Sequence, residues 1–233
     1  MTAFKPTPRS RIKRLPKRAH YERETVHAVL DAALIAHIGY VIDGAPYVTP
    51  TAFWRAGDTL YWHGSSASRM LRTLGEGVPA CVAVTHFDGF VLARSGFHHS
   101  INYRSVTAFG VAYKVEDKVE AEAALDAFMA KFAPGRWAEA RPPTPKELKG
   151  TTVLRMEIDE AAAKIRTGPP IDDEADYALP VWAGVLPVRM VFGALEPDPR
   201  LNPGTVVPGY LKDLAPGTAL DEALKRIAGR AKP

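Results

Sequence analysis

Short Asp/Gly turns separate the apolar runs in the first part of the chain and limit the folds that it can adopt. They lie at Asp43-Gly44, Gly57-Asp58 and Asp88-Gly89. An Asp-Gly pair between two strand-like runs is a strong hairpin signal, because both residues tolerate the backbone of a tight turn. The first two turns predict a β-meander with strands over residues 36–42, 47–54 and 59–63. The third turn predicts a further hairpin, from residues 80–85 into residues 90–95.

Apolar spacing predicts helices between and after these strands. One helix is expected over residues 22–34 and a longer amphipathic helix over residues 119–132. Thr144-Pro145-Lys146-Glu147 has the form of a capping box with proline at the first helical position, so a short helix should begin there. Alternation predicts strands over residues 103–115 and 152–158. About six antiparallel strands with a few helices indicate a mainly β fold with flanking helices (α+β), most simply a small barrel.

The composition is that of a soluble globular protein, with 46% hydrophobic and 24% charged residues among 233. No uninterrupted apolar run approaches the roughly 20 residues that a membrane span needs. The basic N-terminus has no apolar block behind it, so a secretory signal is not expected. Cys81 is the single cysteine and cannot form an internal disulfide, which fits a reducing compartment. We therefore expect a cytoplasmic protein of one domain with an extra arm or tail, or at most two small domains.

Positive charge is concentrated near the start of the chain. Eight lysines and arginines lie within the first segment: Lys5, Arg9, Arg11, Lys13, Arg14, Lys17, Arg18 and Arg23. One interpretation is an arm that binds nucleic acid, and the other is a solvated arm laid across the domain or a partner subunit. Aromatic residues for base stacking are not interleaved with these charges. The solvated arm is therefore favoured, and nucleic-acid binding is not expected.

Residues 59–72 have the pattern of a strand that runs into a helix through a small polar turn containing Ser65, Ser66 and Ser68. Serines cap helix N-termini, where the first backbone N–H groups have no partner, and a phosphate could fill that gap. Arg69 and Arg72 lie one helical turn apart, so both could bind one phosphate. The alternative is an ordinary helix cap. Neither G-x-x-x-x-G-K-[ST] nor G-x-G-x-x-G occurs, which disfavours nucleoside triphosphates and dinucleotides bound in those two ways.

A second candidate for chemistry is the polar segment over residues 97–106, which leads into a predicted strand. It contains the adjacent residues His98 and His99. Side chains at successive strand positions point to opposite faces, and no Cys, Asp or Glu lies at zinc-site spacing. We therefore expect no metal site in this segment.

Several blocks of the sequence resemble the pyridoxamine 5′-phosphate oxidase-like flavin-nucleotide-binding proteins, in particular the branch that includes the nitroimidazole-resistance proteins. The likeness extends from about Arg11 to about Pro199. It is carried, in order, by Arg14-Leu15-Pro16, residues 59–65, residues 98–106, Pro134-Gly135-Arg136-Trp137, residues 166–170 and residues 178–184. The resemblance implies an antiparallel Greek-key split β-barrel that pairs as a homodimer, with one FMN in each of two grooves at the subunit interface. The chain then divides into a basic arm (1–20), an FMN-binding domain (21–192) and a Pro-rich tail with a short helix (193–233).

Carried over position by position, the resemblance assigns flavin contacts to particular residues. The turn from Gly64 to Arg69, with Ser65 and Ser68, is similar to the FMN phosphate clamp. The strand around Thr49, Pro50 and Thr51 resembles the one that borders the flavin ring, and His63 lies at the strand end beside it. Tyr103, Arg104 and Ser105 match the next ring-side and phosphate-side contacts.

Near the C-terminal end of the likeness, Trp182 and Arg189 are loosely similar to a Trp and Arg pair of the true oxidases. The Arg-Leu-His-Asp-Arg sequence of those oxidases is absent. Its absence argues against pyridoxamine phosphate as the substrate.

The first functional hypothesis is an FMN-dependent oxidoreductase that reduces a small aromatic, nitro or quinone-like compound. The cofactor would supply the redox chemistry, with His63 and His99 as the candidates for a catalytic side chain near the ring. The second hypothesis is a protein that binds flavin or haem without turnover, in which His63, His98 or His99 could be the axial ligand. Nucleic-acid binding through the basic arm is the third.

Overall fold

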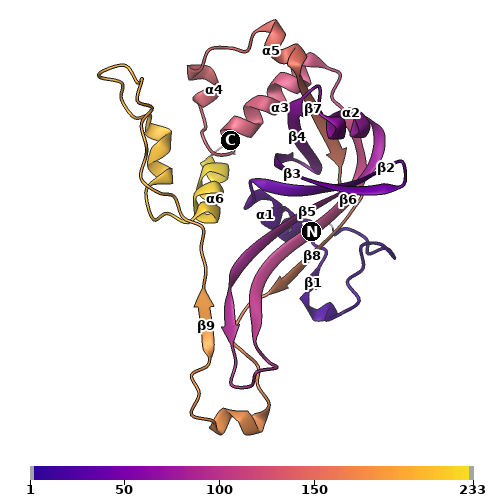
Figure 1. Cartoon of the computed structure of the whole chain (residues 1–233), viewed down its shortest axis with the longest axis vertical. Coiled ribbons are helices and arrows are strands. Elements are labelled where there is room, and N and C mark those ends of the chain that lie inside the picture. The colour runs from indigo at the N-terminus through magenta and orange to yellow at the C-terminus, as the bar shows by residue number, and fades with distance from the viewer. Residues whose placement is uncertain (1–2, 231–233) are drawn as a thin grey trace. The chain divides into compact units, whose positions relative to one another are not determined.

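The computed structural model describes residues 3–230 (Figure 1). The chain forms two compact units that alternate along the sequence. The first unit contains the described residues up to Pro50, residues 80–110 and residues 158–189. The second unit contains residues 51–79, residues 111–157 and the described residues from Met190 onward. Three strands continue from one unit into the other: β3 (Ala45–Ala56), β5 (Glu76–Leu92) and β6 (Ser100–Lys114).

Nine strands of the described chain belong to one sheet, and the pairings within each unit are antiparallel. The other six are β1 (Ala19–His20), β2 (Ile35–Ile42), β4 (Thr59–Ser65), β7 (Thr151–Glu157), β8 (Glu160–Arg166) and β9 (Gly184–Pro187). In the first unit, β8 lies between β1 and β6, and β5 pairs with β2 and β9. In the second unit, β7 lies between β6 and β4, and β4 pairs with β3. The predicted mainly β, antiparallel fold is confirmed.

The predicted β-meander is also confirmed, because β2, β3 and β4 are successive neighbours in the sheet. Its two turns have the backbone that tight hairpins need, with φ values of 50° at Asp43, 78° at Gly44 and 61° at Gly57. In β4, Leu60 and Trp62 are completely buried. The alternation that predicted this strand therefore reflects a core-facing and an outer face.

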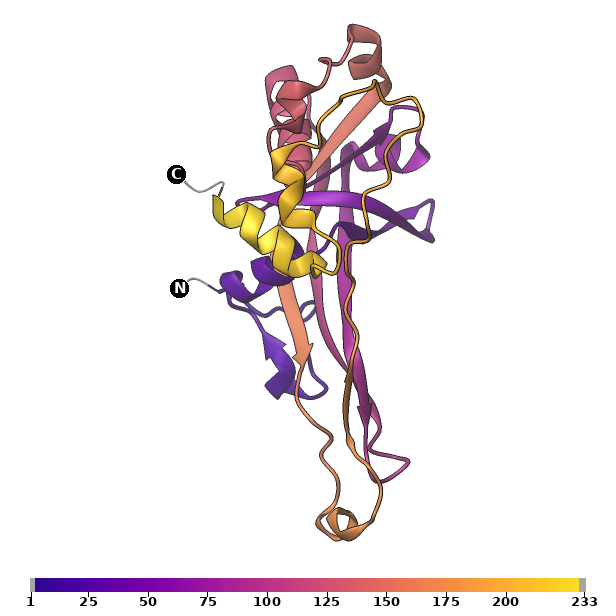
Figure 2. The same cartoon turned by 90° about the vertical axis from the view of Figure 1, so that its left-hand side faces the viewer.

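In the first unit, β5 and β6 form a long two-stranded ribbon, and β9 lies beside β5 (Figures 1 and 2). The turn predicted at Asp88-Gly89 is wrong, because β5 continues through both residues and the chain reverses over residues 93–99. Gly89 has a different role. A Cβ at this position would lie 2.6 Å from the carbonyl oxygen of Leu186, so glycine permits the close approach of β9.

Most of the described helices lie where apolar spacing and capping residues predict them. They are α1 (Arg23–Asp31), α2 (Arg69–Leu74), α3 (Lys118–Ala130), α4 (Arg136–Glu139), α5 (Pro145–Gly150) and α6 (Leu220–Arg230), with short 3-10 helices η1 (Pro16–Arg18), η2 (Glu174–Ala178) and η3 (Gly209–Leu214). The predicted capping box of α5 is confirmed, because the Glu147 N–H donates to Thr144 Oγ1 at 3.3 Å and the Thr144 N–H donates to the Glu147 carboxylate at 2.7 Å. No helix within residues 3–230 is long and apolar enough to cross a membrane.

The core of the second unit lies under α3. Trp54, Val115, Ala124 and Val153 are buried together, and Phe128 packs against them. The apolar stripe predicted for α3 is therefore a packing surface. The same unit contains α6, whose Ala223 and Ile227 pack with Leu214 of η3.

Candidate functional site

The turn that the sequence predicts to hold a phosphate lies in the second unit. β4 ends at Ser65 and α2 begins at Arg69, which confirms the strand-turn-helix order. Ser65 Oγ accepts a hydrogen bond from the Ala67 N–H at 3.2 Å. Ser68 is the N-cap residue, but its side chain makes no capping hydrogen bond. Its hydroxyl is therefore not engaged in the ordinary cap, and the phosphate role of Ser65, Ser68 and Arg69 stays a prediction.

His63 lies near the end of β4 in the same unit, beside two aromatic rings. Its ring centroid is 5.7 Å from that of Trp54 and 5.2 Å from that of Phe128. Its Nδ1 is buried and has no hydrogen-bond partner in the described part of the chain. Burial lowers the pKa of His63 below its usual value of 6.5, which favours the neutral ring. A neutral imidazole can bind a metal or exchange a proton through one nitrogen.

The other predicted flavin contacts divide between the units. Thr51 and Gly64 belong to the second unit, and Thr49, Pro50, Tyr103, Arg104, Ser105 and Trp182 belong to the first. Within the first unit, Thr49 Oγ1 lies 3.0 Å from the Tyr40 hydroxyl, and Ser105 Oγ donates to the Lys164 carbonyl oxygen at 3.2 Å. Arg104 binds Asp88 through Nε and Nη2. Trp182 is 68% exposed. These side chains thus have partners or solvent around them, and their contacts with flavin stay predictions.

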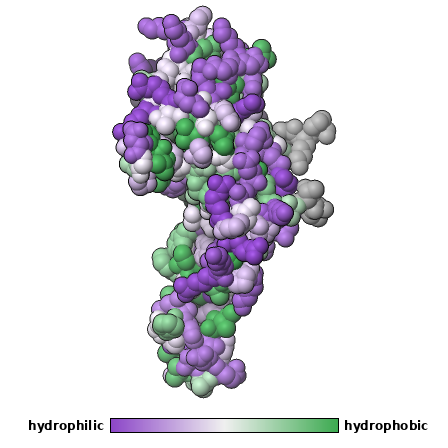
Figure 3. Space-filling model, turned by 90° about the vertical axis from the view of Figure 1, so that its right-hand side faces the viewer, coloured by the Kyte–Doolittle hydropathy of each residue, from purple (hydrophilic) through white to green (hydrophobic). Residues whose placement is uncertain are grey.

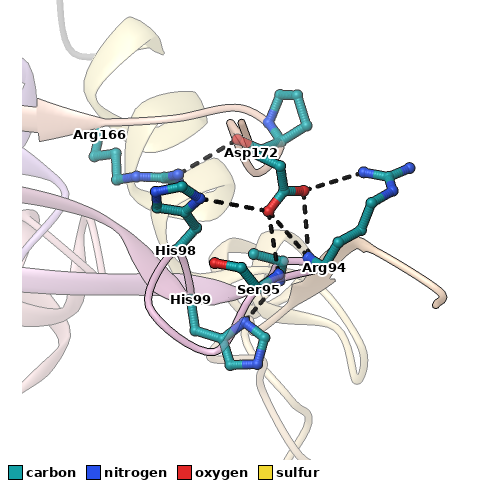
Figure 4. Close-up of polar contacts among 8 residues, drawn as sticks. Arg94, Ser95, His98, His99, Arg166 and Asp172 are labelled. Carbon is teal, nitrogen blue, oxygen red and sulfur yellow. Dashed lines mark hydrogen bonds and ion pairs between the residues drawn. The ribbon is translucent and has the colours of Figure 1, made fainter. Parts of the chain in front are cut away.

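A polar cluster that the sequence did not reveal surrounds Asp172 in the first unit (Figure 4). The buried Asp172 carboxylate accepts hydrogen bonds from the Arg94 N–H at 3.0 Å, from Arg94 Nη1 at 3.1 Å and from the Ser95 N–H at 3.4 Å. Burial alone would raise the pKa of Asp172, but the hydrogen bonds from Arg94 and Ser95 lower it, so the group stays ionised at neutral pH. The carboxylate therefore fixes the end of the β5–β6 ribbon.

His98 and His99 make different contacts in this cluster (Figure 4). His98 Nδ1 is buried and lies 3.7 Å from Asp172 Oδ1, which is too long for a hydrogen bond, and it has no hydrogen-bond partner in the described part of the chain. A proton on Nδ1 would face the carboxylate and leave the lone pair on Nε2, which no residue within 3–230 hydrogen-bonds. His99 Nδ1 instead accepts a hydrogen bond from the Ala93 N–H at 2.8 Å, which puts the proton of the neutral ring on Nε2. Of the two rings, His98 is the one suited to bind a metal through Nε2.

Asp176 also lies near this pair. One nitrogen of His98 and the carboxylate oxygens of Asp172 and Asp176 lie within 4.8 Å of one another. Three donors already occupy the Asp172 oxygens, so this carboxylate is better suited to orient His98 than to bind an ion directly.

A buried arginine holds the segment that carries Asp172. Arg166 Nη1 donates to Asn102 Oδ1, and Arg166 Nη2 donates to the Pro169 carbonyl oxygen at 3.3 Å. Asn102 Nδ2 donates to the Gly168 carbonyl oxygen at 3.1 Å. Burial lowers the pKa of Arg166. The Arg166–Pro170 motif thus has a structural role, which is to direct the chain from β8 toward Asp172.

One exposed aromatic side chain lies beside His98. The Phe97 side chain is 94% exposed and its ring centroid lies 6.2 Å from that of His98. Ile101, Leu179 and Trp182 of the same unit are also exposed. Figure 3 shows apolar side chains interspersed with polar ones over this part of the surface.

The chain matches the family model described as pyridoxamine 5′-phosphate oxidase over residues 22–165. The protein belongs to this family, as the sequence blocks predicted. A search of curated proteins returned no match.

Solved structures support the same assignment. The structure of the flavocytochrome Anf3 from Azotobacter vinelandii is 43% identical, covers 90% of this chain and 97% of its own, and has a TM-score of 0.85. The FAD and haem binding protein from Mycobacterium smegmatis is 39% identical, covers 87% of this chain and 98% of its own, and has a TM-score of 0.82.

A candidate 5-nitroimidazole antibiotic resistance protein from Bacteroides thetaiotaomicron shares the fold at 20% identity. The match covers 63% of this chain and 86% of that chain, with a TM-score of 0.52. The predicted split-barrel fold is confirmed by these neighbours.

Proposed function

We propose that this protein is a flavin- and haem-binding redox protein in which His98 binds the haem iron. The observation that carries the proposal is the His98–Asp172 pair, in which Nδ1 faces a buried carboxylate and Nε2 is left for a ligand. A metal-binding histidine typically directs its other ring nitrogen to such a carboxylate. The names of the two structures at 43% and 39% identity, a flavocytochrome and an FAD and haem binding protein, support the same cofactors.

The surface around His98 suits a haem. Haem presents a flat apolar ring with two anionic propionates at its edge, so its site needs apolar side chains against the ring and cations or solvent at that edge. Phe97 supplies an exposed aromatic ring next to His98. Arg94 lies on the other side of Asp172, with its guanidinium 4.8 Å above the Tyr177 ring. His98 would hold the iron, and Asp172 would fix the tautomer and orientation of the ring.

The flavin part of the proposal rests on family membership and on the turn between β4 and α2. The Ser68 hydroxyl makes no cap bond there, so Ser68, Ser65 and Arg69 would hold a flavin phosphate. Bound flavin and haem supply the electron-transfer chemistry, and the protein positions them and admits the acceptor. We further propose a small aromatic, nitro or quinone-like acceptor and a cytoplasmic homodimer. FMN is the cofactor that the sequence predicts, whereas the related Mycobacterium smegmatis protein is an FAD and haem binding protein.

The haem assignment is tested with the absorbance spectrum of protein purified from cells supplied with a haem precursor. We expect a Soret band that is lost in His98→Ala and retained in His99→Ala, the neighbouring control. Both variants should retain bound flavin. A Soret band that persists in His98→Ala and disappears in His63→Ala would move the axial ligand to His63. Protein that takes up neither haem nor flavin would overturn the proposal.

The flavin assignment is tested in the same preparations. The flavin released on denaturation is identified by chromatography against FMN and FAD. We expect Ser68→Ala combined with Arg69→Ala to lose flavin, and Thr73→Ala on the same helix to retain it. For the acceptor, the bound flavin is photoreduced and its reoxidation is followed with nitro and quinone compounds. Reoxidation no faster than that of unbound reduced flavin would contradict a reductase role.

A further inference from the structure

Residues 11–18 of the first unit, which we call the basic loop, carry a group of cations beside β1 and β8. The 3-10 helix η1 ends the loop and packs against β8, and β1 follows it, with Ala19 opposite Lys164 of β8 (Figure 1). Four cations of the loop are exposed, and their side chains make no hydrogen bond or ion pair with any residue that the structure describes: Arg11, Lys13, Arg14 and Lys17.

Carboxylates on either side of the basic loop have other partners. Residues 3–21 contain no acidic residue. Glu22, which follows β1, has its carboxylate 3.9 Å from His20 Nδ1. Glu160 of β8 is bound by Arg9 at 2.6 Å. The positive charge of the loop is therefore not compensated by these groups, and such a charged surface attracts an acidic partner.

Hydrogen bonds hold the basic loop in one conformation. The Ile12 N–H donates to the Tyr21 hydroxyl at 3.0 Å, and the Arg11 N–H donates to the Thr7 carbonyl oxygen at 2.9 Å. Leu15 has φ 55° and ψ 60°, a left-handed backbone that residues other than glycine rarely adopt. A loop that is ordered before binding loses little conformational entropy when a partner docks on it.

Leu15 also favours a protein as the partner. Its apolar side chain is 38% exposed and lies between Arg14 and Lys17 in the sequence. Protein interfaces combine an apolar centre with a polar rim. Nucleic acid is disfavoured, because the basic loop has no aromatic residue on which a base could stack and no α-helix that could enter a DNA groove.

The basic loop adjoins the segment that leads to the proposed haem site. Arg18 lies close enough to Arg166 for its charge to lower the pKa of Arg166 further, after the larger effect of burial. Arg166 Nη2 in turn donates to the Pro169 carbonyl oxygen, in the segment that leads to Asp172. The loop and the His98–Asp172 pair are thus connected through the same short stretch of the first unit.

We propose that the basic loop docks an acidic electron-carrier protein that reduces this protein. The inference rests on the proposed function, because a haem- and flavin-binding redox protein needs a source of electrons. The carrier gives one electron to the ferric haem, which becomes ferrous, and no bond or proton is transferred. Encounters between electron-transfer proteins bury little surface, less than about 1,200 Å², and charge complementarity sets their rate. Leu15 supplies the central contact, and the cations around it orient the carrier.

The test uses the full chain and an acidic plant-type [2Fe–2S] ferredoxin as the probe. Dissociation constants are measured by calorimetry for the wild type and for the triple variant Lys13→Gln, Arg14→Gln and Lys17→Gln. We expect the triple variant to bind at least about tenfold more weakly at about 0.05 M salt, and the difference to shrink at about 0.3 M, because salt screens exposed charges. A control that removes the same charge from exposed cations of the second unit should bind like the wild type: Lys146→Gln, Lys225→Gln and Arg226→Gln.

Leu15→Ala keeps every charge and should weaken binding by about threefold or more at both salt concentrations. In stopped-flow experiments at low salt, reduced ferredoxin should reduce the haem of the triple variant more slowly than that of the control.

No ferredoxin binding by the wild type, or equal affinities of the triple variant and the control, would overturn the proposal. A DNA duplex of about 20 base pairs is titrated in parallel. Duplex binding that is tighter than ferredoxin binding and is lost in the triple variant would also overturn it, and would assign the loop to nucleic acid. If the purified protein contains no haem, the proposed function fails separately, and calorimetry still decides whether the basic loop docks an acidic protein.

Discussion

Arg104 on β6 binds Asp88 on β5 through two parallel hydrogen bonds, from Nε at 2.9 Å and from Nη2 at 2.8 Å. The side chains are only 27% and 26% exposed. A planar guanidinium that binds a carboxylate in this way is held in one orientation. The pair therefore connects the two strands of the ribbon and fixes a side chain that the sequence also assigns to flavin.

Removing either partner of this pair should destabilise the protein, because the other charge is left partly buried. We expect Arg104→Gln and Asp88→Asn each to lower the free energy of unfolding by about 1–2 kcal/mol. The double variant should lose clearly less than the sum of the two. Urea denaturation of all four proteins gives the coupling energy, and additive losses would show that the two residues do not act as a pair.

The lowered pKa of His63 predicts a pH dependence of stability. The unfolded chain binds a proton at the usual histidine pKa of about 6.5, whereas the folded chain binds it only at lower pH. Between these two values the unfolded state holds more protons, so the free energy of unfolding falls as the pH decreases below about 6.5. Urea denaturation of the wild type and of His63→Phe at two pH values measures this. A slope that is identical in the variant would assign the effect to other groups.

Asn102 should be important for stability, because it is the side chain that accepts a hydrogen bond from the buried Arg166 guanidinium. Asn102→Ala removes that acceptor and the donor to the Gly168 carbonyl oxygen. We expect the free energy of unfolding to fall by about 2–3 kcal/mol. Ser105→Ala on the same strand removes one neutral hydrogen bond and should cost about 1 kcal/mol or less. Comparable losses in the two variants would show that the hydrogen bond from the buried Arg166 guanidinium to Asn102 contributes no more than a neutral one.

Gly89 can be tested against a matched glycine in the same unit. A Cβ at residue 89 would lie 2.6 Å from the Leu186 carbonyl oxygen, whereas one at Gly96 would meet nothing within 4 Å. We expect Gly89→Ala to lower stability by about 2 kcal/mol or more and to increase amide exchange over β9. Gly96→Ala should change neither. Unchanged exchange at β9 in Gly89→Ala would show that the strand can move away without cost.

The sequence predicts those turns and helices that depend on residues close together in the chain. The Asp43-Gly44 turn, the α5 capping box and the α3 stripe each depend on residues a few positions apart, and all three are present. Strand β8 was missed because its alanines and charged residues have no strand preference of their own. It becomes a strand because β6 pairs with it from Tyr103 opposite Arg166 to Phe109 opposite Glu160.

In the candidate site, too, residues close together in the sequence could be recognised, whereas those that meet only in the fold could not. The histidines of the 97–106 segment were recognised, but Asp172 was not, because it lies far along the chain in an acidic turn with no spacing relation to them. Only the fold brings the carboxylate to His98. The Asp88-Gly89 pair shows the opposite failure, because a strong local turn signal is overridden by the pairing of β5 with β9.

The alternation of the two units along the chain has a consequence for evolution. Each unit is assembled from three separate stretches of sequence, and β3, β5 and β6 belong to both. No contiguous stretch of the gene therefore encodes one unit without part of the other. Recombination consequently cannot exchange either unit by itself as a module.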